Sequence, residues 1–355
     1  MTNSKYNLFV GSYASENESS IYGMTLDTAS GELSSKSSYS GIESPSFLTI
    51  HPNGRWLYAV SETGMSSHGM HGSVHAFEIQ PDSLELKPIN HQSAKGDWTC
   101  HVEIDHTGRW LVATNYGSGD AALYPILADG ALGEMASFVQ HAGSGPNKAR
   151  QEGPHAHSAV FTPDNNYVIV ADLGIDQLAM YTFDAQSGAL TKHAEVAANP
   201  GSGPRHFAFH PNNRILYCAN ELDSSVTVYA YDATAGALEP LQTLSTLPAA
   251  NPESSVADIH ISPEGEHLYI SNRGHNSVAV YKVDADGRLS ALGFPSCGGN
   301  WPRNFALGVD GRQLLIANRR TNDIVTLSVD LAQVEMSKIQ SQVSIMEPSC
   351  IKLIK

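Results

Sequence analysis

Several histidine, arginine and glutamate residues have side chains that indicate acid–base chemistry on a charged ligand. His157 and Glu221 can act as general acid or base. Arg205 and Arg273 carry guanidinium groups, which hold carboxylate or phosphate through paired hydrogen bonds. We therefore predict these four as catalytic residues. Five further residues are predicted to bind the ligand: His101, Arg303, His155, Arg150 and Lys148.

Each of these residues also has a purely structural interpretation. His157 could hydrogen-bond a neighbouring sheet, and Arg205 could form a salt bridge with Glu221 between strands. The remaining arginines could be solvated charges at a rim. The joint occurrence of a histidine, a glutamate and several arginines favours a site, because charges near a pore mouth cost desolvation unless they are paired or used.

The segment His155-Ala-His157 raises the question of a metal site. Residues two apart on a strand point the same way, so both histidines could ligate zinc. No third ligand stands beside them at a reliable spacing, so we predict no metal and no cofactor. The sequence also contains no GxSxG turn and no GK[ST] phosphate loop, so nothing indicates a covalent serine mechanism.

Residues 141–154, HAGSGPNKARQEGP, form the longest insertion between repeats and lead directly into His155. Loops longer than about 12 residues are often functional. Lys148 and Arg150 would bring positive charge over the site. The segment is therefore interpreted either as a lid or as a plain surface loop.

An internal repeat sets the elements that must position these residues. A turn followed by an alternating apolar strand begins at His51, Asp105, Thr162, His210, Ser262 and Gly308. Short turns ending in Leu or Val, from Leu33 to Val334, recur about 50 residues apart. Seven units of four strand-like runs fill the 355 residues. This pattern predicts a single all-β domain over residues 1–355, a seven-bladed β-propeller with four antiparallel strands per blade. A β-solenoid is the alternative, although its coils are shorter.

The same repeat predicts which residues share a position. Residues 7–12 resemble a second strand and residues 349–354 a first strand, so one blade should be closed by both ends of the sequence. In first strands, which face the channel, one position holds Ser46, His157, Arg205, Ala257, Arg303 and Ser349, with His101 within one residue of it. After second strands, the matching position holds Glu62, Tyr116, Leu173, Glu221, Arg273 and Arg319. A purely structural repeat would keep one residue type, so this variety indicates a site at one end of the channel.

Composition excludes several classes of function. The net charge is −15, which disfavours nucleic acid and anionic membrane surfaces as partners. Neither a signal-peptide pattern nor an apolar run long enough to span a membrane is present. The four cysteines form no CxxC pair, and three fall in strand-like runs as buried thiols. We therefore expect a cytoplasmic protein, monomeric by default, whose partner is a small anionic molecule held by a local basic patch.

The motifs resemble a known family. GSGPRHFAFHPN from Gly201, ADIHISPEGEHLYISNR from Ala257 and RQEGPHAHS from Arg150 resemble the bacterial cycloisomerase-type 6-phosphogluconolactonases across all seven repeats. That family is a seven-bladed propeller, and it is similar to the fungal carboxy-muconate lactonising enzymes. The resemblance implies a functional histidine, two arginines and a glutamate at one end of the channel, matching His157, Arg205, Glu221 and Arg273.

The resemblance favours hydrolysis of a sugar lactone such as 6-phosphoglucono-δ-lactone. His157 or Glu221 would take a proton from water, and Arg205 would stabilise the tetrahedral oxyanion. Arg273 and Arg303 would hold the phosphate. One alternative is a muconate-type lactonising or delactonising enzyme that uses the same groups on a dicarboxylate. The other is a propeller scaffold without chemistry, although no WD dipeptide closes these repeats.

Overall fold

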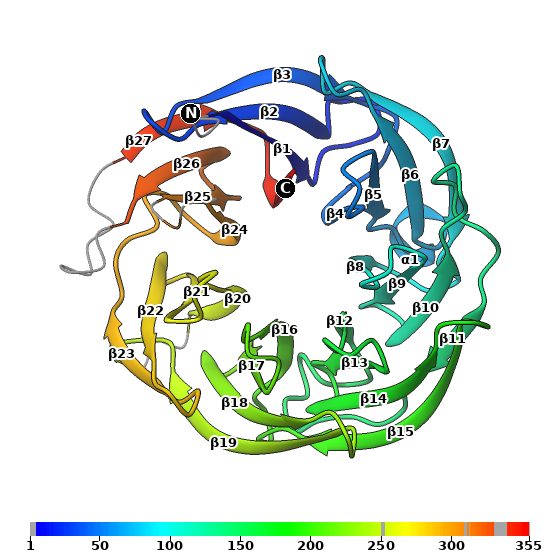
Figure 1. Ribbon diagram of the computed structural model, residues 1–355, viewed down its shortest axis with the longest axis vertical. Helices are drawn as coiled ribbons and strands as arrows, with labels where there is room; N and C mark the ends of the chain where they lie inside the picture. The colour runs from blue at the N-terminus through cyan, green and yellow to red at the C-terminus, as the bar shows by residue number, and fades with distance from the viewer. Residues whose placement is uncertain (1–4, 250–252, 309–310, 312, 330–338, 355) are drawn as a thin grey trace. The chain divides into compact units, whose positions relative to one another are not determined.

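The computed structural model describes residues 5–249, 253–308, 311, 313–329 and 339–354. In these ranges 28 strands form seven antiparallel sheets of four strands each (Figure 1). The helix found in this part of the chain is a single turn, α1 (Met65–His68). The four-stranded sheets confirm the repeat, while its last turn, ending at Val334, lies outside the described residues.

The chain divides into two compact units, and the first comprises Tyr13–Tyr22 and Ser37–Arg205. That one domain spans residues 1–355 stays a prediction. The first unit contains three complete sheets, each in simple chain order. Their strands are β4 (Leu48–Ile50), β5 (Trp56–Ser61), β6 (Ser73–Ile79) and β7 (Leu86–Ser93); β8 (Thr99–Ile104), β9 (Trp110–Asn115), β10 (Asp120–Pro125) and β11 (Ser137–Gln140); and β12 (Ala156–Phe161), β13 (Tyr167–Asp172), β14 (Gln177–Asp184) and β15 (Ala189–Ala197).

The second unit comprises Met1–Ser12, Gly23–Lys36 and His206–Ile354. Three of its sheets also follow chain order, although the first two residues of β16 belong to the first unit. Their strands are β16 (Pro204–Phe209), β17 (Ile215–Asn220), β18 (Ser225–Asp232) and β19 (Ala237–Ser245); β20 (Ser255–Ile261), β21 (His267–Arg273), β22 (Ser277–Val283) and β23 (Leu289–Gly293); and β24 (Pro302–Leu307), β25 (Gln313–Asn318), β26 (Asp323–Ser328) and β27 (Ile339–Ser344).

The seventh sheet joins the two ends of the sequence. Its order is β28-β1-β2-β3, with strands β28 (Pro348–Leu353), β1 (Lys5–Ser12), β2 (Ile21–Asp27) and β3 (Leu33–Tyr39). Strand β28 pairs antiparallel with β1, with Leu8 opposite Leu353 and Val10 opposite Ile351. The predicted closure of one sheet by both ends of the sequence is confirmed.

Burial changes systematically from strand to strand within a sheet. The second strands β5, β9, β17 and β25 are buried along their whole length, because both faces pack on apolar neighbours. The fourth strands β7, β15 and β19 are largely exposed and often alternate with partly buried positions, as expected for a half-solvated strand. The first strands, at the opposite edge of each sheet, carry four of the nine predicted site residues: His101, His157, Arg205 and Arg303.

Glycine turns between third and fourth strands fit closely against the neighbouring sheet. Gly130 has φ +86°, and a Cβ there would lie 2.5 Å from the indole of Trp56. Its carbonyl accepts a 2.9 Å hydrogen bond from the buried Tyr58 hydroxyl. The same bond recurs from Tyr217 to Gly287 in the second unit. Only glycine suits such a turn, since it needs both a left-handed backbone and close packing.

All four cysteines lie in the described residues and are buried, and none forms a disulfide. Cys100, Cys218 and Cys350 stand on β8, β17 and β28 as predicted. Burial raises the pKa of the Cys297 thiol to about 11, so this thiol stays protonated near neutral pH.

Candidate active site

A β-bulge sets the position of the predicted first-strand residues. In four sheets the first strand carries one extra residue between two paired neighbours, so its side chain leaves the regular alternation. The extra residues are Cys100, His157, Arg303 and Ser349. The bulge therefore turns the side chain at this one position away from the direction of its neighbours on the strand. This gives a physical reason why the residue type at this position varies between repeats.

Tyr116, directly after β9, gathers several predicted residues around its ring. The imidazole of His155 stacks on it with centroids 4.4 Å apart and planes 12° apart. His157 meets the ring edge-on at 5.5 Å. The guanidinium of Arg150 donates a 3.2 Å hydrogen bond to the Tyr116 hydroxyl. We call Tyr116, Arg150, His155, His157 and Trp98 the Tyr116 cluster.

Trp98, which the sequence analysis did not name, completes this stack. Its indole is nearly parallel to the Tyr116 ring, with centroids 6.4 Å apart. It is 39% exposed and has φ +57°, an uncommon backbone conformation for a bulky residue. Exposed aromatic rings offer a flat apolar face to a ligand. The sequence did carry a signal for this residue. Trp98 lies two residues before the bulge residue Cys100, just as Trp301 lies two residues before Arg303 in a later repeat.

Asp172 holds the segment that carries the two histidines. Its Oδ1 accepts the backbone N–H groups of His155 at 2.7 Å and of Gly174 at 2.9 Å. His155 in turn donates through Nδ1 to the Tyr116 carbonyl at 2.8 Å, which fixes the orientation of its ring. His155 lies directly before β12, and His157 is the bulge residue of that strand. The two histidines therefore do not lie two apart on a regular strand, which the argument for a zinc pair assumed.

The insertion 141–154 is anchored by Gln151, whose side chain is completely buried. Its amide donates to the Leu173 carbonyl at 2.9 Å and to Asp176 at 2.8 Å, and its Oε1 accepts the Asn147 N–H. Lys148 bonds within the loop, to the Gly145 carbonyl. The insertion thus brings Arg150 to the Tyr116 cluster, whereas Lys148 stays on the loop itself.

Arg205 and His101 are both buried but differ in their surroundings. Arg205 is 2% exposed, and its carbonyl accepts a 2.5 Å hydrogen bond from the Ser158 hydroxyl on β12. His101 stands one residue beyond the bulge position, and its ring packs on Phe47 with centroids 4.4 Å apart. The structure therefore places His101 in a packing position, while Cys100 occupies the bulge.

In the second unit, Glu221 and Arg273 form a buried ion pair. Glu221 follows β17 and is 4% exposed, and its carboxylate lies 2.9 Å from the guanidinium of Arg273 at the end of β21. Arg273 also donates to the Val256 carbonyl at 2.6 Å. Its guanidinium carbon lies 5.7 Å from the ring of Trp301, and that of Arg320 lies 3.5 Å from the same ring. We call these four side chains the Glu221 cluster; Arg303 stands on the bulge of β24 nearby in sequence.

Asp258, which the sequence analysis also missed, binds two histidines in the second unit. Its two carboxylate oxygens lie 2.9 Å from His206 Nδ1 and 2.9 Å from His260 Nε2. Burial alone would raise the pKa of Asp258, but these histidines and the hydrogen bonds they donate hold it well below its ordinary value. Asn304 on β24 donates to the same carboxylate and accepts the Ile351 N–H, so the network links successive first strands.

The chain belongs to the family described as "Lactonase, 7-bladed beta-propeller", whose model matches residues 7–353. The predicted fold class, a seven-bladed β-propeller with four strands per blade, is thereby confirmed. No helix in the described ranges is long and apolar enough to cross a membrane.

Relatives named as lactonases align with almost the whole chain. It is 35% identical to a 6-phosphogluconolactonase of Bacillus subtilis over 99% of both chains. It is 34% identical to a 6-phosphogluconolactonase of Formosa agariphila over 98% of this chain and 99% of that one. Among solved structures it resembles the periplasmic gluconolactonase of Pseudomonas aeruginosa, with a TM-score of 0.93, 30% identity and 99% of both chains covered.

Proposed function

We propose that this chain is a sugar lactone hydrolase that opens 6-phosphoglucono-δ-lactone to 6-phosphogluconate. The observation that carries the proposal is the 35% identity, over 99% of both chains, to a protein of that activity. The Tyr116 cluster supports it, because an aromatic face, an arginine and two histidines suit a polar, anionic sugar derivative.

In the proposed reaction, His157 takes a proton from water as the water oxygen attacks the lactone carbonyl carbon. Arg205 stabilises the negative charge that forms on the carbonyl oxygen. The bond from that carbon to the ring oxygen then breaks, and the leaving oxygen receives the proton held by the imidazole. We prefer His157 to Glu221 as the base because the Glu221 carboxylate is already paired with Arg273 at 2.9 Å.

For the substrate phosphate we propose Arg150, whose guanidinium donates to the Tyr116 hydroxyl. Arg273 and Arg303, in the second unit, stay proposed binding residues. Lys148 and His101 remain proposed binding residues. The Lys148 ammonium bonds within its loop, and the His101 ring packs on Phe47. We further propose a cytoplasmic monomer. The buried cysteines without disulfides support this location, although one relative is periplasmic. Light scattering of the purified chain tests the monomer.

The test is the rate of 6-phosphogluconate formation from fresh lactone, measured against the spontaneous rate. His157→Asn and Arg205→Lys are each expected to lower kcat about 100-fold or more. His267→Asn is the matched control, since His267 lies at the opposite end of β21 from Arg273. Unphosphorylated glucono-δ-lactone is measured in parallel. A higher kcat/KM for that lactone would contradict the proposal that the substrate is phosphorylated. Full activity in both variants would contradict the proposed roles of His157 and Arg205.

A further inference from the structure

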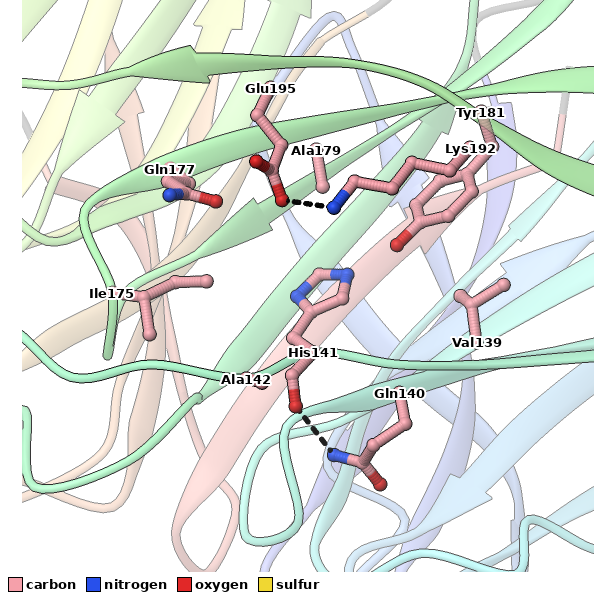
Figure 2. A pocket seen from close by; sticks show the side chains of 10 residues that line it. All are labelled: Val139, Gln140, His141, Ala142, Ile175, Gln177, Ala179, Tyr181, Lys192 and Glu195. Carbon is pink, nitrogen blue, oxygen red and sulfur yellow. Dashed lines mark hydrogen bonds and ion pairs between the residues drawn. The ribbon is translucent and has the colours of Figure 1, made fainter.

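A pocket of about 330 Å³ lies in the first unit, lined by residues outside the Tyr116 cluster. The end of β11 and the two residues after it, Ile175 between β13 and β14, and strands β14 and β15 line it (Figure 2). Its volume falls in the range of small-molecule sites. The proposed lactone chemistry uses none of its lining residues, so the pocket needs its own explanation.

His141 contributes an unusual buried group to this pocket. Its Nδ1 donates to Asp172 Oδ2 at 2.6 Å, and the two side chains are 4% and 0% exposed. Asp172 already accepts two backbone N–H groups through its other oxygen, so it acts as a carboxylate acceptor. With Nδ1 bonded to Asp172, Nε2 is the second hydrogen-bonding atom of the ring, and it is an acceptor in the uncharged imidazole. That atom is buried and has no hydrogen-bond partner within the described structure.

Tyr181 presents a complementary hydroxyl to the same space. Its ring is nearly parallel to that of His141, with centroids 6.1 Å apart, and Figure 2 shows the hydroxyl beside the imidazole. Burial, together with the charges of Glu195 and Asp172, raises the pKa of Tyr181 to about 12. The hydroxyl therefore keeps its proton at neutral pH and can donate it in a hydrogen bond.

The charged residues of the pocket neutralise each other. Lys192 Nζ lies 2.5 Å from Glu195 Oε1, and both side chains are substantially exposed (Figure 2). The pair leaves no excess positive charge for a phosphate or carboxylate. Ala142, Ile175 and Val139 supply apolar surface beside these polar groups. The pocket thus combines a hydrogen-bond acceptor, a donor and apolar patches in a locally neutral setting.

We propose that this pocket binds an uncharged polyhydroxylated molecule of monosaccharide size. A hydroxyl group can donate to His141 Nε2 and accept from Tyr181 in the same complex, which satisfies both groups. Because Nε2 is buried, a lining side chain must move on binding, and the exposed, flexible Lys192 is the one suited to do so. Asp172 bonds to both the His141 ring and the His155 backbone N–H, so it would connect the bound molecule to the segment that carries His155.

The experiment follows the His141 imidazole by long-range ¹H–¹⁵N NMR, with the signal assigned by its loss in His141→Gln. D-Glucose and D-glucitol are titrated separately into the full chain, and D-gluconate serves as the charged control. We expect a saturable shift of the His141 signal with the neutral probes and a weaker effect with gluconate. A shift that does not saturate by about 100 mM, or tighter binding of gluconate, would overturn the proposal.

Two variants keep the test independent of His141 itself. Tyr181→Phe retains the ring but removes the hydroxyl, and should weaken binding about five- to tenfold. Ala142→Trp, at an exposed position on the rim, should abolish the shift by filling the pocket. An undiminished shift in Ala142→Trp would place the ligand elsewhere and reject the pocket.

Discussion

The Tyr116 and Glu221 clusters occupy equivalent places in the repeat but are built differently. Tyr116 and Glu221 each follow the last residue of a second strand. Trp98 and Trp301 each precede a first strand, with φ +57° and +67°. In the first cluster the tryptophan faces a stack of aromatic rings, whereas in the second it packs against two guanidinium groups.

The difference shows how one backbone frame serves two tasks. Stacked rings and one arginine leave polar edges and an exposed indole for a ligand. The Glu221–Arg273 pair instead brings two opposite charges together in a buried place. A repeat therefore fixes where a side chain stands, while the residue type decides which contacts it makes there.

Glu221→Gln should give the largest effect in this comparison. It leaves the Arg273 charge buried without its carboxylate, which typically costs about 3–5 kcal/mol of unfolding free energy. Glu62→Gln is the matched control, because Glu62 holds the same repeat position and accepts hydrogen bonds from the hydroxyls of Tyr13 and Ser46. Urea denaturation should give a loss of about 1 kcal/mol there. Equal losses would remove the contrast between an ion pair and ordinary hydrogen bonds.

Asp258→Asn should change stability in a pH-dependent way. Because the pKa of Asp258 is lowered on folding, its contribution is present above the unfolded pKa of about 3.9 and is lost as pH falls from there toward the folded pKa. At pH 7 the variant should lose about 2 kcal/mol. Below pH 4 the wild-type stability should fall more steeply than that of the variant. Parallel stability profiles from pH 7 to pH 2 would contradict this account.

Tyr116→Phe should affect substrate binding more than folding. The ring stack with His155 and Trp98 remains, but Arg150 loses its 3.2 Å hydrogen bond to the hydroxyl. We expect KM for the lactone to rise about three- to tenfold with little change in kcat. Steady-state kinetics beside a thermal melt separate the two effects. An unchanged KM would mean that Arg150 does not need Tyr116 to reach the substrate.

Arg320→Ala should give the smallest effect. The guanidinium of Arg320 lies 3.5 Å from the Trp301 ring centroid, and losing this cation–π contact should cost about 0.5–1 kcal/mol. Arg55→Ala is the comparison, since Arg55 lies 5.6 Å from the Trp56 ring and should contribute less. Denaturation followed by tryptophan fluorescence measures both. A larger loss for Arg55→Ala would reverse this ranking.

The repeat period predicted the fold because strand and turn patterns depend on local residue types. It also predicted that Tyr116, Glu221 and Arg273 hold equivalent positions. Each directly follows an asparagine that pairs with the start of the third strand: Asn115, Asn220 and Asn272. Pairing β28 with β1 could be foreseen too, because each end of the sequence resembled the missing part of one repeat.

The bulge and the choice of partners could not be predicted in this way. Alternation counts residues evenly, so it cannot reveal that His157 is an extra residue between two paired neighbours. The structure pairs Glu221 with Arg273, a partner that the sequence did not suggest. Such partners depend on side-chain distances across strands that lie far apart in the chain.

The pairing of β28 with β1 has a consequence for biosynthesis. On the ribosome, β1, β2 and β3 are made long before β28, so this sheet must wait as three strands with an open edge. Such an edge can recruit a strand from another nascent chain. Aggregation during synthesis, and the need for a chaperone, should therefore depend on how soon residues 348–353 leave the exit tunnel.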